Sequence, residues 1–436
     1  MSSCGERPRR WAPAAWFAAG ALAGALGLGA VLAARQRPAP DPRAALVRGV
    51  FDAILAHADR PMSPKQLDEL ASRRMVEALS DPWAEFLAPE QRRRYRAELR
   101  QPLAVPGVRL RETALGTLVE AVAPQSPAER AGVRPGDRAH RLPASRLGAL
   151  LLDLRAPGET AWRRVQFAPG GVPDRVEALP LADAAVLLRV PRFYEGVTRD
   201  VERALASAAR GGATHVLFDL RGNPGGLFEE GIALAEVLLD SGRVVATVDA
   251  RGGARRQRIL DRAPQRWPGL RASVLIDSTS ASSAELVAAA WQDHGRARLV
   301  GTPTFGKGVF QTTVALQDGY AVRISSGRWY SPNGFSPDRA SSGGVRPDVR
   351  AAPAEVTPPA EGEERLLMGV EAAVLGRPPL ELEALVASPA FAAASTDEVT
   401  RLQRWRGGDV RAWQAAFLRE DPFVRAALSS EPGAAP

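Results

Sequence analysis

Lysine is rare in this sequence, and one of its two lysines lies in a glycine-flanked turn. Of the 57 basic residues only Lys65 and Lys307 are lysines, and Lys307 lies within residues 304–308, TFGKG. An arginine keeps its proton in any protein, whereas burial can lower the pKa of a lysine toward neutral pH. Lys307 is therefore a candidate general base. The alternative is that both lysines occur by chance in an arginine-rich sequence and have no special role. The neighbouring motifs distinguish the two hypotheses.

Two further turns carry groups that such a base could serve. Residues 219–226, DLRGNPGG, follow a strand pattern, and their paired glycines could aim backbone N–H groups at a reacting carbonyl oxygen. Residues 278–285, STSASSAE, precede a helix, where a serine hydroxyl near the positive helix end could act as a nucleophile. Each turn also has an ordinary interpretation: glycines that supply positive φ in the first, and serines that cap a helix, with Glu285 in its first turn, in the second.

A lysine base must be largely dry. Lowering its pKa from ~10.4 to about 7 corresponds to roughly 4 kcal/mol in favour of the neutral amine, which requires burial beside groups such as Phe305. His294, beside Asp293, could in principle complete a serine–histidine–aspartate set, but adjacent residues rarely orient one another productively. The other histidines lie in patterns that favour structural roles: His57, His140 and His215. A serine–lysine pair is the stronger hypothesis.

Composition places the chain among globular proteins of two or three domains. Its 436 residues are 45% hydrophobic and 24% charged, which excludes a disordered protein. The net charge of +8 comes from scattered arginines without a basic run, so no nucleic-acid partner is expected. The only cysteine, Cys4, precedes a long apolar segment, so the rest of the chain has no disulfide, thiol nucleophile or cysteine-bound metal.

That apolar segment, residues 11–34, is 24 residues long and carries no charge. At ~1.5 Å per residue it is long enough to cross a hydrocarbon layer of roughly 30 Å. Small residues near Ala33 also fit a cleaved signal peptide. The length and the arginines that follow favour an uncleaved membrane anchor, and in either case the remainder is exported.

The pattern of apolar residues changes several times along the chain. Alternating strand and helix patterns after residue 184 predict a largely parallel sheet, and residues 309–325 resemble a hairpin around Asp318 and Gly319. Helices are expected near residues 364–375 and 400–418. The predicted divisions are an N-terminal segment with linker, a helical part, a β-rich domain, an α/β core and a Pro/Ala-rich linker with a helical extension: 1–42, 43–100, 101–183, 184–350 and 351–436.

Four motifs in this order closely resemble those of the C-terminal processing peptidases, also called tail-specific proteases. They are residues 218–226 (FDLRGNPGG), 280–287 (SASSAELV), 292–297 (QDHGRA) and 304–308 (TFGKG). The likeness extends to residues 81–83 (DPW), 330–334 (YSPNG) and 344–348 (GVRPD), and residues 126–137 (SPAERAGVRPGD) look like a PDZ signature. Together the resemblance covers about residues 43–375.

The resemblance implies an α/β fold: a crotonase-like βαβ peptidase core with an inserted PDZ-like domain, an N-terminal helical segment and a C-terminal helical extension. It implies a serine–lysine dyad of Ser282 and Lys307, 25 positions apart, with Gln311 orienting the lysine. The implied oxyanion donors are the backbone N–H of Gly225 or Gly226 and that of Ser283. Asp293 matches a supporting acidic position, and no metal or cofactor is implied.

Two positions depart from the family pattern. Residues 102–113 lack the glycine-rich entry that normally forms the carboxylate-binding loop of a PDZ domain, so the resemblance does not imply capture of a free C-terminus. Ser283 and Ala284 exchange the usual alanine and serine, which should spare the chemistry.

The sequence therefore predicts a serine endopeptidase that cleaves exported proteins near their C-termini, anchored to the inner membrane with its catalytic part in the periplasm. Its expected partners are protein or peptide substrates and the membrane, and the interpretation leaves open an adaptor protein or a homo-oligomer. The rival hypothesis is a catalytically silent, PDZ-bearing binding or sensor protein on the same scaffold. A Ser282–His294 hydrolase is a more distant third.

Overall fold

The computed structural model describes residues 42–113, 116–142, 150–156, 159, 161–168, 170–181, 184–250, 255–261, 264, 266–352, 418 and 421–429. The chain divides into two compact units, Met1–Ala78 and Leu79–Pro436. The described part of the first unit contains helices α2 (Pro42–His57) and α3 (Pro64–Glu77). The start of α3 is fixed by Ser63 and Gln66, each of whose side chains accepts the other's backbone N–H.

Within the described ranges, no helix is long and apolar enough to cross a membrane. The predicted membrane segment, residues 11–34, lies outside them. Of the predicted 43–100 helical part, strand β1 (Glu85–Leu87) and helix α4 (Pro89–Arg100) belong to the second unit.

A six-stranded sheet forms the centre of the second unit, in the order β18-β15-β14-β11-β10-β9. All neighbouring strands are parallel except β9, which runs antiparallel to β10, so the predicted largely parallel sheet is confirmed. Apolar residues on successive positions face opposite sides, so both faces are buried. Its strands are β9 (Glu177–Pro180), β10 (Ala185–Arg189), β11 (His215–Asp219), β14 (Arg271–Ile276), β15 (Arg298–Gly301) and β18 (Val349–Arg350).

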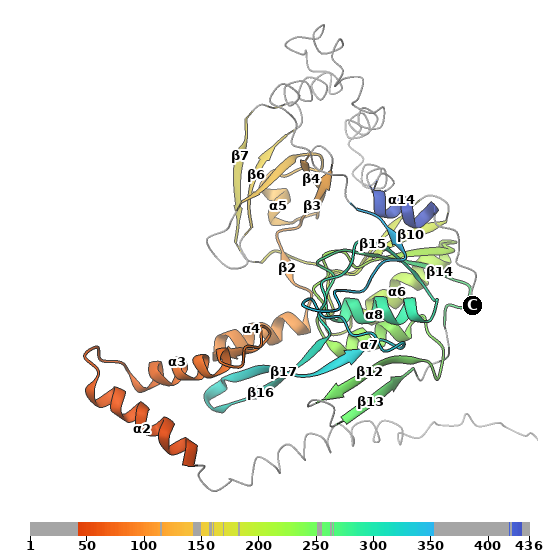
Figure 1. Cartoon of the computed structure of the whole chain (residues 1–436). Coiled ribbons are helices and arrows are strands. Elements are labelled where there is room, and N and C mark those ends of the chain that lie inside the picture. The colour runs from red at the N-terminus through yellow and green to blue at the C-terminus, as the bar shows by residue number, and fades with distance from the viewer. Residues whose placement is uncertain are drawn as a thin grey trace, which may run out of the picture. The chain divides into compact units, whose positions relative to one another are not determined.

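One face of this sheet packs on three helices, and a second sheet contacts two of them on their far side (Figure 1). The helices are α6 (Val197–Arg210), α7 (Phe228–Glu236) and α8 (Ser283–Asp293). Trp291 of α8 is fully buried, and its ring N–H donates to the carbonyl of Ala235 at 2.8 Å. Because α8 is buried along nearly its whole length, its first turn is held rigidly.

The second sheet is antiparallel, in the order β1-β17-β12-β13, with β16 also paired to β17. The hairpin of β16 (Val309–Ala315) and β17 (Ala321–Tyr330) confirms the predicted one, with Asp318 and Gly319 in its turn. The sequence pattern assigned β12 (Val244–Ala250) to the parallel series, but it pairs antiparallel with β13 (Arg255–Leu260) and β17. The arginine-rich β13 was not predicted, because its polar side chains hide the strand pattern.

The β-rich part of the chain contains a five-stranded antiparallel sheet in the order β3-β4-β5-β6-β7. Its small core includes Val119, Ala128 and Leu152. The elements are β3 (Val108–Thr113), β4 (Gly116–Val122), α5 (Pro127–Arg130), β5 (Arg138–Leu142), β6 (Leu150–Arg155) and β7 (Arg163–Phe167). A separate pair, β2 (Ala104–Val105) and β8 (Val172–Pro173), completes the described strands of this region.

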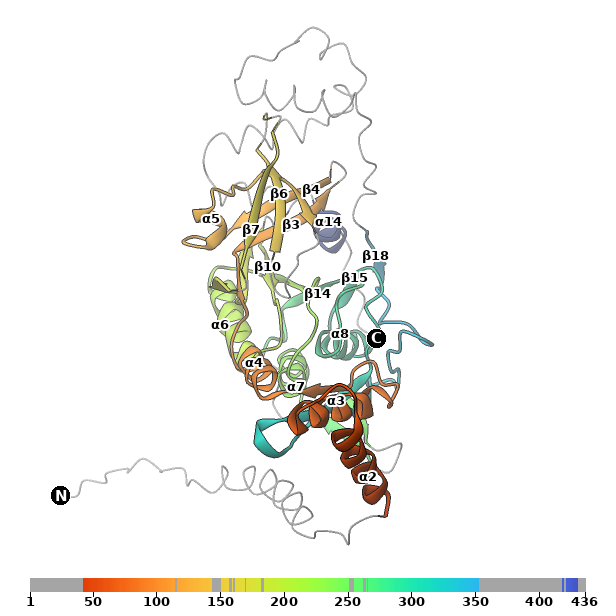
Figure 2. The same cartoon turned by 90° about the vertical axis from the view of Figure 1, so that its left-hand side faces the viewer.

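The other face of the parallel sheet is covered by α14 (Pro422–Ser429), near the C-terminus of the chain. Figures 1 and 2 show α14 alongside β15, and Phe423 and Val424 are buried against Leu275 and Val300. The predicted helix at 364–375 lies outside the described residues, as does that at 400–418 apart from Leu418.

Candidate active site

The serine turn, residues 277–283, places a strained residue at the start of α8. Ser282 has φ 56° and ψ −116°, a backbone conformation that costs a non-glycine residue about 1–3 kcal/mol. Within the described chain, its hydroxyl makes no capping hydrogen bond to α8. The hydroxyl is therefore available at the amino end of a helix, where partial positive charge favours a developing anion.

The glycine loop, residues 221–226, packs directly against the serine turn. The carbonyl of Asn223 accepts the N–H of Ala281 at 2.9 Å. Gly225 has φ 90°, and a Cβ there would lie 2.8 Å from both the carbonyl oxygen of Ala281 and the Cβ of Ser282. Only glycine fits so close to the serine, which explains one of the paired glycines.

The glycine loop and α8 leave two backbone donors unused. The N–H of Gly225 donates to the side-chain oxygen of Asn223 at 2.8 Å, so it is already engaged. The N–H groups of Gly226 and Ser283 meet no acceptor among the described residues. Of the donors that the sequence suggested, Gly226 and Ser283 are therefore the available pair.

Glu285, in the first turn of α8, joins the serine turn to the lysine turn, residues 304–308. Its carboxylate accepts the N–H of Ser282 at 2.8 Å, as the capping pattern predicted. It also accepts the N–H of Gly306 and of Lys307, each at 2.7 Å, and the hydroxyl of Thr304 at 2.6 Å. The side chain is fully buried. The last three bonds were not predicted, because they span 19 to 22 residues.

Lys307 is half-buried and contacts two side chains through its ammonium group. Its Nζ donates to Oε1 of Gln311 at 3.4 Å, the partner that the resemblance implied. Nζ also lies 4.3 Å from the centroid of the Trp83 ring, a cation–π contact. The Nε2 of Gln311 is buried and has no partner among the described residues.

Burial lowers the pKa of Lys307 below its ordinary value, and the positive charge of Arg323 acts in the same direction. The carboxylates of Glu285 and Asp81 oppose the shift. Its direction is the one that a lysine base requires.

The structure brings the serine and lysine turns together but does not join their reactive groups. No hydrogen bond links the hydroxyl of Ser282 to the Nζ of Lys307 within the described residues; Nζ pairs with Gln311 instead. Catalytic hydrogen bonds are often long without substrate. The turns that carry Ser282 and Lys307 share the carboxylate of Glu285, and the lysine side chain is turned to Gln311.

Comparison with known proteins accounts for this arrangement. Residues 185–351 match the family model described as peptidase family S41. We refer to residues 185–351 as the S41 segment, because this part of the chain matches the family model. The S41 segment contains every site residue that the sequence suggested, and the predicted resemblance is confirmed at the level of the family.

Similar curated proteins are probable CtpA-like serine proteases of staphylococci. The chain is 22% identical over 302 residues to that of Staphylococcus haemolyticus, a match covering 66% of this chain and 60% of the relative. It is 24% identical over 318 residues to that of Staphylococcus aureus strain RF122, covering 70% and 64%. The chain thus spans 60% to 64% of the length of these relatives.

Among solved structures, one similar to this chain is a photosystem II D1 C-terminal processing protease. The two are 25% identical with a TM-score of 0.47, and the match covers 74% of this chain and 90% of the other.

Trp83 lies before the S41 segment in sequence but contributes to its site. Asp81 accepts the N–H of Ser325 at 3.0 Å, and β1 pairs with β17, so the indole is held beside the lysine turn. Its ring also meets that of Phe305 edge-on, with centroids 5.8 Å apart. Sequence reasoning noted residues 81–83 only as a motif and missed the contact with Lys307.

Asp293 and His294 lie at the far end of α8, about 17 Å along the helix from Ser282. Asp293 accepts the hydroxyl of Ser331 at 2.5 Å and the N–H of Asn333 at 2.8 Å, so it braces the loop after β17. The ring of His294 pairs with the carbonyl of Val244 at 2.8 Å. Neither side chain is brought to the serine turn, and a Ser282–His294 pair is not formed.

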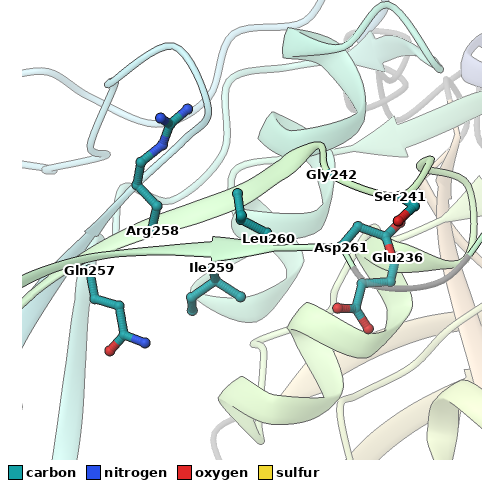
Figure 3. A pocket seen from close by; sticks show the side chains of 8 residues that line it. All are labelled: Glu236, Ser241, Gly242, Gln257, Arg258, Ile259, Leu260 and Asp261. Carbon is teal, nitrogen blue, oxygen red and sulfur yellow. The ribbon is translucent and has the colours of Figure 1, made fainter.

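A cavity of about 640 Å³ lies between the end of α7 and strand β13 of the S41 segment. Figure 3 shows its lining, which includes Glu236, Arg258 and Asp261. It shares no residue with the serine, glycine or lysine turns. Among the described residues, no group of three histidine, cysteine or acidic side chains could hold a metal ion.

Proposed function

We propose that this chain is a serine endopeptidase that cleaves exported proteins near their C-termini. The observation that carries the proposal is the buried carboxylate of Glu285, which accepts the N–H of Ser282 and that of Lys307. One rigid side chain thereby fixes the backbone of the nucleophile relative to that of the base. The likeness to probable serine proteases supports the same chemistry.

In the first half of the reaction, neutral Lys307 takes the proton of the Ser282 hydroxyl. The serine oxygen attacks the peptide carbonyl, and the N–H groups of Gly226 and Ser283 stabilise the oxyanion. The C–N bond then breaks as Lys307 returns the proton to the leaving amine. The products are an acyl-enzyme on Ser282 and a released C-terminal fragment.

The second half repeats these roles with water. Lys307 takes a proton from a water molecule, whose oxygen attacks the acyl-enzyme ester. Collapse of the second oxyanion breaks the bond to Ser282, which recovers its proton from Lys307. Both halves require the lysine Nζ to approach the serine oxygen, so the side chain must turn away from its position over Trp83.

Substrate delivery is the second part of the proposal. We assign residues 101–183 to a PDZ-like domain inserted in a crotonase-like peptidase, because the PDZ signature contains the short helix α5 and lies between β4 and β5 of a five-stranded antiparallel sheet. This domain would bind the substrate close to its C-terminus. Residues 11–34 would anchor the chain in the inner membrane with the catalytic part in the periplasm.

The test is covalent labelling by a serine-reactive probe in the full-length protein. We expect the wild-type chain to be labelled on Ser282, the Ser282→Ala variant to be unlabelled, and Lys307→Arg to lose about 10²-fold or more in labelling rate because a guanidinium cannot act as a base. Mass spectrometry of exported proteins, with and without active Ser282, should then show altered C-termini.

A folded wild-type protein that takes up no probe would contradict the proposal and favour the silent binding protein. Labelling that persists in Lys307→Arg would leave a serine enzyme but remove the lysine as its base.

A further inference from the structure

The helix α14 places a charged residue beside the active site from the far end of the chain. Asp421 directly precedes α14, and its side chain is only 1% exposed. One carboxylate oxygen accepts the N–H of Phe423 at 2.9 Å, which caps the helix. The other accepts Nη1 of Arg221 at 2.7 Å, across 200 positions of sequence.

Arg221 is the first residue of the glycine loop, and its guanidinium is held on several sides. Asp219 accepts Nε at 2.8 Å and Nη2 at 2.7 Å, a two-point contact from the end of β11. The guanidinium also lies 4.9 Å from the centroid of the Phe423 ring. Asp421 and Phe423 thus close a clamp around Arg221 from the C-terminal helix.

The clamp is connected to the free donors of the active site by a short stretch of backbone. Gly226 lies five positions after Arg221, and its N–H faces no acceptor among the described residues. Gly222, which directly follows Arg221, donates its N–H to Asp277 of the serine turn at 3.2 Å. Movement of Arg221 would therefore move the backbone that carries the Gly226 N–H.

Stability alone does not explain the clamp. The apolar residues of α14 already bury one face against the sheet. A buried ion pair adds little stability relative to apolar packing, but it fixes the geometry of its partners. The carboxylate of Asp421 orients the guanidinium of Arg221 in the glycine loop, which apolar side chains could not do.

We propose that Asp421 is a positioning residue for the oxyanion site: through Arg221, it holds the glycine loop and its Gly226 N–H in place. The inference rests on the proposed peptidase function. It assigns the C-terminal helix, whose role the sequence did not reveal, to the catalytic core.

The test compares two variants of Asp421 with one control variant of α14, all in the full-length protein. Asp421→Ser keeps a helix cap but cannot reach Arg221, and Asp421→Asn keeps both shape and cap while losing the charge. Val424→Ala is the control, since it removes buried apolar volume from α14 without touching Arg221.

We expect Asp421→Ser to lower kcat about 10-fold or more with little change in KM, less than the 10²–10³-fold loss typical of a deleted oxyanion donor. Affinity for a peptide aldehyde, which forms an oxyanion on Ser282, should fall by a similar factor. Asp421→Asn should fall between Asp421→Ser and wild type. Val424→Ala should lower the melting temperature but leave kcat unchanged well below it.

Amide hydrogen exchange supplies a readout that does not need activity. The exchange rate in residues 221–227 should rise in Asp421→Ser. In Val424→Ala it should rise no more than in the rest of the chain. The inference would be overturned if Asp421→Ser kept the kcat, aldehyde affinity and exchange of the wild type. It would also be overturned if Val424→Ala lost as much kcat and aldehyde affinity as Asp421→Ser. If Ser282→Ala matches the wild type in peptide hydrolysis, the proposed function fails, while exchange still decides the role of Asp421.

Discussion

At the scale of single residues, the proposed chemistry depends on the charge state of Lys307. Its surroundings contain opposing influences: burial and Arg323 lower its pKa, whereas Glu285 and Asp81 raise it. The cation–π contact with Trp83 also favours the charged form. Scarcity of lysine singled out this residue in the sequence, but no sequence pattern could reveal the indole and guanidinium that surround it.

The activity should rise with pH along a limb set by Lys307, because only the neutral amine can accept the serine proton. Arg323→Gln removes a nearby positive charge that lowers the pKa of Lys307, so the pKa rises. The lysine then stays charged to higher pH, and we expect the limb of the kcat/KM profile to move to higher pH.

The matched control for this profile is Arg328→Gln on the same strand, where the arginine pairs with Asp338 and does not contribute to the pKa of Lys307. A limb that stays in place in Arg323→Gln, or moves to lower pH, would show that another group controls the profile.

At the scale of elements, three turns are assembled by contacts that sequence motifs mark but do not explain. The strand–turn–helix pattern predicted where the glycine loop and serine turn begin, because apolar runs and glycines report local structure. The side-chain oxygen of Asn223 accepts the N–H of Gly225, so the N–H of Gly226 is the one without an acceptor among the described residues.

Two glycines of the same loop provide a matched pair of variants. Gly225→Ala and Gly222→Ala both place a side chain at positive φ, 90° and 72°, at a cost of about 1–2 kcal/mol each. Only at Gly225 would the new Cβ collide with the serine turn, since nothing lies within 4 Å at Gly222. We expect both to lose stability and only Gly225→Ala to lose labelling of Ser282. Equal labelling of the two would mean that the close contact is dispensable.

Glu285→Gln tests the link between the serine and lysine turns. An amide has one acceptor oxygen, so one pair of donors would face an NH₂ group, and each unsatisfied buried donor costs about 1–3 kcal/mol. We expect the free energy of unfolding to fall by about 2 kcal/mol or more in urea titrations, and probe labelling to slow sharply.

The control is Glu90→Gln, because the Glu90 side chain is 80% exposed. Its change in unfolding free energy should stay within about 0.5 kcal/mol. Comparable stability in the two variants would argue that the Glu285 bonds are not structural links.

At the scale of the whole molecule, the periodicity of apolar residues predicted the main elements but not which elements contact one another. The parallel sheet and the hairpin follow from apolar runs and a turn pattern, and both are present. The placement of β12 was wrong because a strand pattern does not state which sheet the strand joins. The packing of α14 and its reach to Arg221 depend on residues 200 positions apart, which no local pattern records.

The full-length chain should fractionate with membranes if residues 11–34 form an uncleaved anchor. A variant lacking residues 1–41 should remain in the soluble fraction, and sequencing of the purified wild-type chain should find an N-terminus before Trp11. A mature N-terminus after residue 34 would establish the signal-peptide alternative instead.

The Glu285 link also has a consequence for the timing of catalysis. In the proposed mechanism, the backbones of Ser282 and Lys307 share one buried anchor, so the lysine side chain is the part that must move to engage the serine. Such rotations take picoseconds to nanoseconds in exposed side chains, far faster than typical turnover of about 1–10³ per second. The resting contacts of Lys307 would then make kcat proportional to the fraction of molecules in which the lysine has left Trp83 and Gln311. They would add no slow step to the reaction.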